Sequence, residues 1–127
     1  MIIYCCTDLI FATKIGSTAK QLGVPSRPAR DVNSMSQRLQ DEEVSAVLID
    51  LDLEDEAMRI LRRVKERDRS IPVIAFGSHV ATEILQAARA GGADLVMSRS
   101  QFTTQIPQLL QQFGKGDSET VTSAPSG

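Results

Sequence analysis

The strongest concentration of charged side chains is the segment DLDLEDE at residues 50–56, which places five carboxylates in seven positions. Acidic residues stabilise the first turn of a helix, and Glu54–Glu56 stand where such a turn should begin. Asp50 is different, because it ends the apolar segment SAVLID and should point into a crevice at the end of a buried strand. We therefore interpret Asp50 as a functional, or formerly functional, carboxylate, with Asp52 close to it.

Polar side chains also follow the other predicted strands. Sites in open α/β sheets lie beyond the carboxyl ends of the strands, where the strand order reverses. The first strand–helix junction, CCTDLIF, contains neither GxGxxG nor GxxxxGK[ST], which argues against a dinucleotide or nucleoside triphosphate site. The remaining candidates at strand ends are Thr7, Asp8, Gly77, Ser78, His79, Ser98, Arg99 and Ser100.

The two cysteines, Cys5 and Cys6, are adjacent in the sequence. Consecutive cysteines rarely bond to each other, because their spacing distorts disulfide geometry. Two cysteines and a single histidine cannot assemble a zinc site within the chain. The pattern favours two reduced thiols in or beside a buried strand. A nucleophilic or redox role for Cys6 is the alternative, because a cysteine before a helix can have a lowered pKa.

Short apolar runs alternate with segments whose apolar residues recur at steps of three and four, which predicts alternating strands and helices. Pro25 and Pro28 confine the second strand to a sheet edge, because proline cannot donate a ladder hydrogen bond. Strands are predicted at 1–6, 24–31, 45–50, 71–76 and 94–98. The helical stripes are Phe11, Ile15, Ala19 and Leu22; Met35 and Leu39; Ala57, Ile60, Leu61 and Val64; Ala81, Ile84, Leu85 and Ala88; and Ile106, Leu109, Leu110 and Phe113.

Several helix ends can be placed from polar residues and glycines. Asp8 can cap the first helix and Gly23 can end it, whereas Asn33 or Ser34 can cap the short second helix. Gly91-Gly92 should end the fourth helix. Five strand–helix units with right-handed crossovers predict an α/β domain with a doubly wound parallel sheet.

The composition agrees with one small domain. The chain has 127 residues, a mass of 13.8 kDa and a net charge of −2, which argues against a generally basic nucleic-acid-binding protein. No apolar run approaches the roughly 20 residues of a membrane span, and the N-terminus lacks a signal-peptide pattern. We expect a soluble cytoplasmic protein with one domain at residues 1–113 and a disordered tail at 114–127.

The segment AARAGGADLVM at 87–97, the strand ending in Asp50 and the five strand–helix units resemble the receiver domain of CheY-like response regulators. The resemblance spans residues 1 to about 113 and implies a flavodoxin-like (βα)5 fold with strand order 2-1-3-4-5. It implies a non-enzymatic signalling module that works with a histidine kinase or an output protein. By this resemblance, Asp50 accepts a phosphoryl group from a phosphohistidine and Mg2+ is held by Asp8 and Asp50 in a weak site.

The match to the functional residues of this family is partial. Only Asp8 is available for the acidic pair of the family, and Asp52 completes an acidic pocket. The Ser/Thr switch position of the family, after the fourth strand, falls on Gly77 next to Ser78. The lysine position falls on Ser98 or Arg99, and the proline that should follow is absent. We therefore expect a degenerate receiver that acts through protein contacts. A working receiver phosphorylated on Asp50 and a Cys6-dependent redox or phosphocysteine carrier domain are the alternatives.

One predicted helix has a basic outer face. Such a face is usually solvated and partly paired with neighbouring acids. Docking of an acidic partner or of nucleic acid is the alternative, with nucleic acid the less favoured. A homodimer through the last strand and helix is also compatible with the resemblance. The basic residues are Arg59, Arg62, Arg63, Lys65, Arg67 and Arg69.

Overall fold

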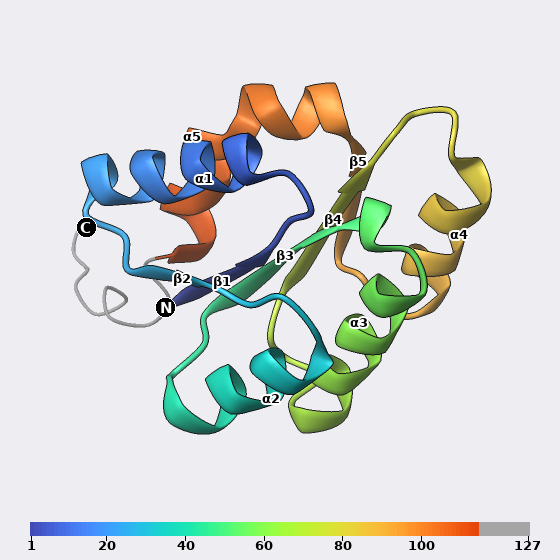
Figure 1. Cartoon of the computed structure of the whole chain (residues 1–127), viewed down its shortest axis with the longest axis horizontal. Coiled ribbons are helices and arrows are strands. Elements are labelled where there is room, and N and C mark those ends of the chain that lie inside the picture. The colour runs from blue at the N-terminus through green and yellow to red at the C-terminus, as the bar shows by residue number, and fades with distance from the viewer. Residues whose placement is uncertain (115–127) are drawn as a thin grey trace.

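Strands and helices alternate along the chain in the computed structural model, which describes residues 1–114 (Figure 1). A short 3-10 turn at Leu51–Leu53 joins the third strand to the third helix. The strands are β1 (Ile2–Cys5), β2 (Ser26–Pro28), β3 (Ala46–Asp50), β4 (Val73–Gly77) and β5 (Leu95–Ser98). The helices are α1 (Leu9–Leu22), α2 (Val32–Asp41), α3 (Asp55–Arg67), α4 (Thr82–Ala90) and α5 (Arg99–Gly114).

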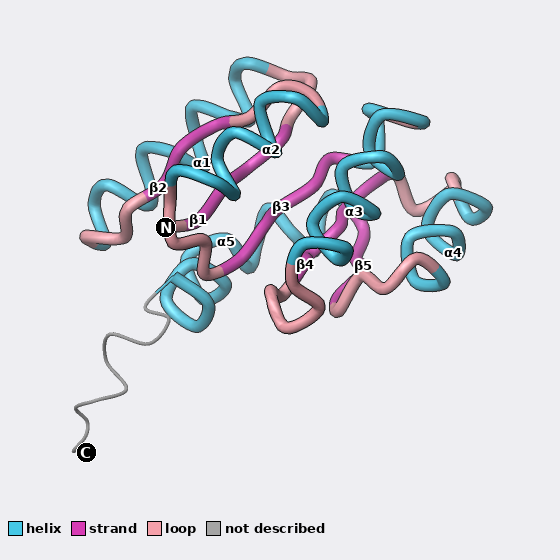
Figure 2. The backbone as a smooth tube through the Cα atoms, turned by 90° about the horizontal axis from the view of Figure 1, so that it is seen from below, coloured by secondary structure: helices cyan, strands magenta, loops and turns pink. Residues whose placement is uncertain are grey.

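The five strands form one parallel sheet in the order β2-β1-β3-β4-β5. This order confirms the predicted flavodoxin-like (βα)5 fold. Figure 2 shows the strands crossing the molecule, with β2 at one side and β5 at the other. The register pairs Cys5 with Ile49, Asp50 with Phe76 and Gly77 with Ser98, so the carboxyl ends of four strands meet at one edge.

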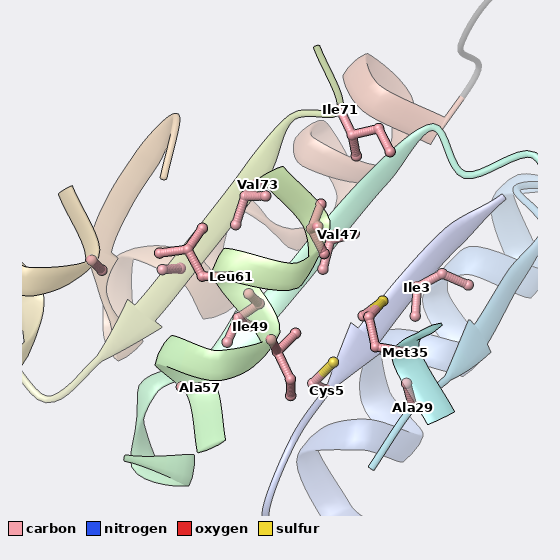
Figure 3. Packing of buried hydrophobic residues seen from close by; sticks show 14 of the residues in the cluster. Ile3, Cys5, Ala29, Met35, Val47, Ile49, Ala57, Leu61, Ile71 and Val73 are labelled. Carbon is pink, nitrogen blue, oxygen red and sulfur yellow. The ribbon is translucent and has the colours of Figure 1, made fainter. Parts of the chain in front are cut away.

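The two faces of the sheet are covered by different helices (Figures 1 and 2), with α1 and α5 on one side and α2, α3 and α4 on the other. Strand β3 is buried along its whole length and alternates between two cores. Val47 and Ile49 belong to the core under α2 and α3, whereas Leu48 belongs to the core under α1 and α5. Figure 3 shows the first of these cores, with Leu61 of α3 above the sheet.

The predicted ends of α1 are confirmed. The carboxylate of Asp8 accepts a hydrogen bond from the N–H of Ile10, and Gly23 ends the helix with φ of 71°. A left-handed residue at this point favours glycine, because other side chains are strained there. The edge position of β2 is also confirmed, since it pairs only with β1 among the described strands.

The strand boundaries differ from the prediction by one to three residues, most of all at β2, which is confined to Ser26–Pro28. Asp31, not Asn33 or Ser34, caps α2, and Ser34 donates its N–H to the Asp31 carboxylate in a capping box. Strand β4 begins at Val73, because Pro72 lacks an N–H. Helix α5 begins at Arg99 directly after β5, so no loop separates Arg99 from the strand.

Helix α5 continues to Gly114, which is buried, one residue beyond the predicted end of the domain. The rest of the predicted tail, 115–127, lies outside the described residues. Over residues 1–114, no helix combines the length and apolar character that crossing a membrane requires.

An ion pair ties α3 to the turn before β5. The Lys65 ammonium donates to Asp94 Oδ2 at 2.8 Å and to the carbonyls of Ile71 and Arg69 at 2.8 and 3.1 Å. Asp94 Oδ2 also accepts the N–H of Val73 at 2.8 Å. Burial alone would raise the pKa of Asp94, but the bonds from Lys65 and Val73 lower it. Asp94 therefore links α3, β4 and β5.

We expect Asp94→Asn to lower the free energy of unfolding by about 1 kcal/mol near neutral pH, because the Asp94 side chain is half exposed and the pair is partly screened. The stability from a carboxylate of lowered pKa is complete above its unfolded-state pKa of about 3.9. It is lost as the pH falls through the lowered pKa of the folded state. Urea unfolding with Glu66→Gln as control should show the difference shrinking below about pH 4. An equal loss of unfolding free energy near neutral pH and below about pH 4 would contradict this prediction.

Candidate functional site

Asp50 is the last residue of β3 and its side chain has no exposed surface. Its Oδ2 accepts the N–H and the hydroxyl of Thr7 at 3.2 and 3.1 Å. Its Oδ1 accepts the N–H of Asp52 and the guanidinium Nη2 of Arg99, both at 3.0 Å. A carboxylate has about four lone-pair positions. The four donors therefore satisfy Asp50 completely.

Arg99 supplies the positive charge of this site. Its Nη2 bridges Asp50 Oδ1 at 3.0 Å and Asp52 Oδ2 at 2.8 Å. The guanidinium carbon lies 5.5 Å from the ring centroid of Phe11 and 5.6 Å from that of Phe76, which adds cation–π attraction. Burial alone would lower the pKa of Arg99, but the hydrogen bond and charge of Asp50, and the charge of Asp52, raise it. Arg99 is therefore a permanent cation between two carboxylates.

Three phenylalanines form the apolar wall beside this cation. Phe76 and Phe102 stack with their ring centroids 3.9 Å apart, and Phe11 lies 5.4 and 5.7 Å from them. An apolar wall lowers the local dielectric, so the attraction between Arg99 and Asp50 is stronger than it would be in water. Phe102 is missing from the predicted stripe of α5. Extending that stripe four residues back from Ile106 would have included it.

The structure brings some of the predicted site residues together and separates others. Asp50, Asp52 and Arg99 form one hydrogen-bonded group with Thr7. Asp8 is exposed and its carboxylate caps α1, so no hydrogen bond joins it to this group.

The two predicted switch serines have local partners. Ser98 precedes α5 and forms a capping box, in which its hydroxyl accepts the N–H of Gln101 and its own N–H donates to Gln101 Oε1. The Ser78 hydroxyl accepts the N–H of Val80 at 3.4 Å. Both serines line a hollow of about 390 Å3 beside Arg99. The structure thus places Ser78 and Ser98 near Arg99, and within residues 1–114 neither serine forms a hydrogen bond with Asp50.

The donor set does not fit the magnesium ion that the resemblance implies. Magnesium needs carboxylate oxygens and several waters in octahedral geometry. The Asp50 oxygens are occupied by protein donors, Asp8 is used as a helix cap, and Arg99 already bridges Asp50 and Asp52. Within residues 1–114, no group of three or more His, Cys, Asp or Glu side chains could hold a metal. In this arrangement the oxygens of Asp50 are not free for the expected weak site with Asp8, and that site stays a prediction.

No protein-family model matches the sequence, and no curated protein matches it. Solved structures do match. The receiver domain of NtrX from Brucella abortus has a TM-score of 0.78 at 16% identity, covering 91% of this chain and 98% of that domain. A CheY-like receiver domain protein from Methanospirillum hungatei gives 0.72 at 16% identity, covering 90% and 95%. The TorR receiver domain gives 0.74 at 16% identity, covering 88% and 97%.

This chain has the receiver-domain fold. It covers only 26% of a longer NtrX chain that it also matches, at 16% identity. The receiver fold places Asp50 at the carboxyl end of the middle strand and Arg99 at the end of β5. The resemblance implies a lysine at Ser98 or Arg99. That position is therefore next to, or occupied by, an arginine that already binds Asp50.

Cys6 follows β1 in this receiver fold and is partly buried. Burial first of all, and then the charge of Asp50, raise the pKa of Cys6 to about 12, although Arg99 opposes the shift. Burial also raises the pKa of Cys5. The expectation of a lowered pKa at Cys6 is therefore wrong. A protonated thiol is a poor nucleophile, which argues against the redox and phosphocysteine alternatives.

The Arg99–Asp50 pair should be strongly coupled in stability. We expect Arg99→Ala to cost about 3 kcal/mol, because it leaves a buried carboxylate without its cation. In an Asp50→Asn background the same change should cost only about 1 kcal/mol, because no buried charge remains. Denaturant unfolding of the four proteins measures the coupling, with the exposed Arg89→Ala as control. If the two substitutions lowered the free energy of unfolding additively, the result would contradict a buried Arg99–Asp50 pair.

Cys6 should react slowly in the folded protein. A pKa of about 12 leaves about one thiol in 10^5 ionised near pH 7, compared with about three in 100 for an ordinary cysteine. We expect iodoacetamide to alkylate Cys6 in a Cys5→Ala variant far faster in urea than under native conditions, as followed by intact mass. Equal rates in the two conditions would contradict the raised pKa.

Proposed function

We propose that this chain is a receiver-like signalling module that acts through protein–protein contacts, with phosphorylation of Asp50 absent or unconventional. The observation that carries the proposal is the saturated Asp50 carboxylate, whose four donors include the Arg99 guanidinium. In this proposal Arg99 supplies permanently the neutralising charge that Mg2+ supplies in a working receiver. The module then needs no metal ion to keep its site folded.

The contacts of Asp50 oppose phosphoryl transfer. In that reaction a carboxylate oxygen forms a bond to phosphorus while the bond between phosphorus and the donor's imidazole nitrogen breaks. Oδ1 is bound by Arg99 and Asp52, and Oδ2 is bound twice by Thr7. Either oxygen must therefore lose donors before it can attack. Loss of the Arg99 contact also exposes Asp50 to the cost of an unpaired buried charge.

The product of that transfer would also be poorly neutralised. A phosphoryl group carries about −1.5 to −2 charges. Each unit-charge contact with Asp52 near 4 Å would cost about 4 kcal/mol at an effective dielectric of 20. Arg99 already bridges Asp50 and Asp52, and it is the cation that these carboxylates contact within residues 1–114. Charge balance therefore favours the unmodified site.

The partner in this proposal is another signalling protein, either a histidine kinase or an output protein, or a second copy of this chain. The receiver domain of NtrC4, a similar solved structure at 12% identity and a TM-score of 0.71, was solved as a beryllofluoride-activated dimer. Here Leu95 on the edge strand β5 is 37% exposed and offers an apolar contact at that edge. The unbonded thiols of Cys5 and Cys6 suit a reducing compartment, and we place the protein in the cytoplasm.

We expect incubation with acetyl phosphate and Mg2+ to leave the intact mass of the protein unchanged. A phosphoryl group would add ~80 Da. The matched variants are Asp50→Asn, which removes the acceptor, and Arg99→Lys, which restores the residue type implied by the resemblance. A receiver domain with a complete acidic pair, treated in parallel, controls for the reagent.

One result would overturn the proposal. Stoichiometric addition of ~80 Da to the unaltered protein, lost in Asp50→Asn, would show a working receiver phosphorylated on Asp50. Addition that appears only in Arg99→Lys would support the proposal, because it would identify Arg99 as the group that blocks the acceptor.

A further inference from the structure

A hollow of about 460 Å3 lies at the edge of the sheet where β4 and β5 begin, opposite the edge where Asp50 ends β3. It is bounded by α3 from Met58 onward, by the chain that follows α3, and by the α4–β5 turn at Gly91. Helices α3 and α4 lie on the same face of the sheet (Figure 1). The volume is in the range of about 300–1,000 Å3 that is usual for binding clefts.

The floor of this hollow is apolar. It is formed by the partly buried Met58 side chain of α3 and by the backbone of Gly91, with Leu61, which is only 2% exposed, beneath them. A Cβ at Gly91 would lie 2.9 Å from Leu61 Cδ2 and 3.4 Å from Met58 Cε, so a side chain there would have to displace this floor. Glycine thus allows the α4–β5 turn to pack closely against Leu61 and Met58 of α3.

The rim carries four basic residues, of which the fold itself uses two. Lys65 is held by Asp94 and by the Ile71 and Arg69 carbonyls, and its side chain is only 13% exposed. The Arg67 guanidinium donates to the carbonyl of Leu39 at 3.4 Å. Both residues also suit the end of α3, because cations are stabilised at the carboxyl end of a helix.

Arg62 and Arg69 have no such role. Both are exposed, and within residues 1–114 neither side chain makes an ion pair or a hydrogen bond. They stand on the rim of the hollow with their donors free. Two carboxylates, Glu66 and Asp68, also belong to the rim. Asp68 accepts the N–H and hydroxyl of Ser70, which hold the pKa of Asp68 below its ordinary value.

We infer that this hollow docks an acidic polypeptide segment of a partner protein, with one aliphatic or aromatic side chain against Met58 and carboxylates on Arg62 and Arg69. Opposite charges around a desolvated apolar anchor are the usual arrangement of a peptide-binding surface. Nucleic acid fits less well. Exposed bases usually stack on aromatic side chains, and the residues that line this hollow include none.

This docking surface goes beyond the proposed function and is independent of the state of Asp50, because the two sites lie at opposite edges of the sheet. Failure of one proposal therefore leaves the other standing. Phosphorylation of Asp50 would not by itself change the charges of Arg62 and Arg69.

A fluorescein-labelled acidic peptide of about ten residues with one central leucine is the probe, and anisotropy at low salt is the measurement. We expect saturable binding that weakens with added NaCl. Arg62→Glu and Arg69→Glu should each weaken binding by at least about fivefold, because each reverses a rim charge. Neither residue contacts the rest of the described chain through its side-chain nitrogens, so both variants should fold, which circular dichroism checks.

Three controls separate the outcomes. Arg30→Glu makes the same charge change at an exposed residue outside the hollow and should alter affinity by less than about twofold. A peptide with serine in place of leucine should bind several-fold more weakly, because the floor then lacks its anchor. A single-stranded oligonucleotide of similar charge should bind more weakly than the peptide. Absence of saturable peptide binding, equal loss in Arg30→Glu, or tighter binding of the oligonucleotide would each overturn the inference.

Discussion

The rest of the site depends on the neutralisation of one buried charge. Asp50 has no exposed surface, and a carboxylate in that position is tolerated only when a cation and several donors replace its water. Arg99 can be that cation because α5 begins directly after β5, which holds its side chain above the end of β3. Phe11 and Phe76 then cover part of the guanidinium, whose side chain is 32% exposed, and add cation–π attraction to the pair. The strand order, the start of α5 and the phenylalanine wall together position Arg99 on Asp50.

Arginine and lysine would not be equivalent in this arrangement. A single guanidinium nitrogen, Nη2, bridges Asp50 and Asp52 while the guanidinium carbon lies 5.5 and 5.6 Å from the centroids of two aromatic rings. An ammonium group is a compact, strongly hydrated charge and gives up its water less readily against apolar rings. Arg99 therefore closes the site more completely than a lysine would. The proposal of an unphosphorylated module uses this fixed charge balance, because a covalent charge switch would require a site whose charge can change.

The sequence predicted the elements of the fold better than their boundaries. The buried strand SAVLID, the helical stripes and the position of Asp50 depend on periodicity and burial, which are visible in the residue pattern. The cap of α2 was placed wrongly because Asp31, Asn33 and Ser34 are all good caps, and the choice depends on backbone geometry. The predicted stripe of the last helix began only at Ile106, so the start of α5 at Arg99 was not predicted, although Ser98 and Gln101 have the spacing of a capping box.

The chemistry of the site was harder to predict than the fold, because it depends on contacts between distant residues. Asp50 and Arg99 are 49 positions apart, and only the register of the sheet shows that they meet. The pKa of Cys6 shows the same limit. The helix that follows Cys6 favours a low pKa, but burial and the charge of Asp50, 44 residues further along, together raise it. Desolvation wins because it acts on the whole thiolate, whereas the helix end acts through its first turn alone. Local motifs therefore identified which side chains gather at this edge of the sheet, but the balance of burial and charge determined what those side chains can do.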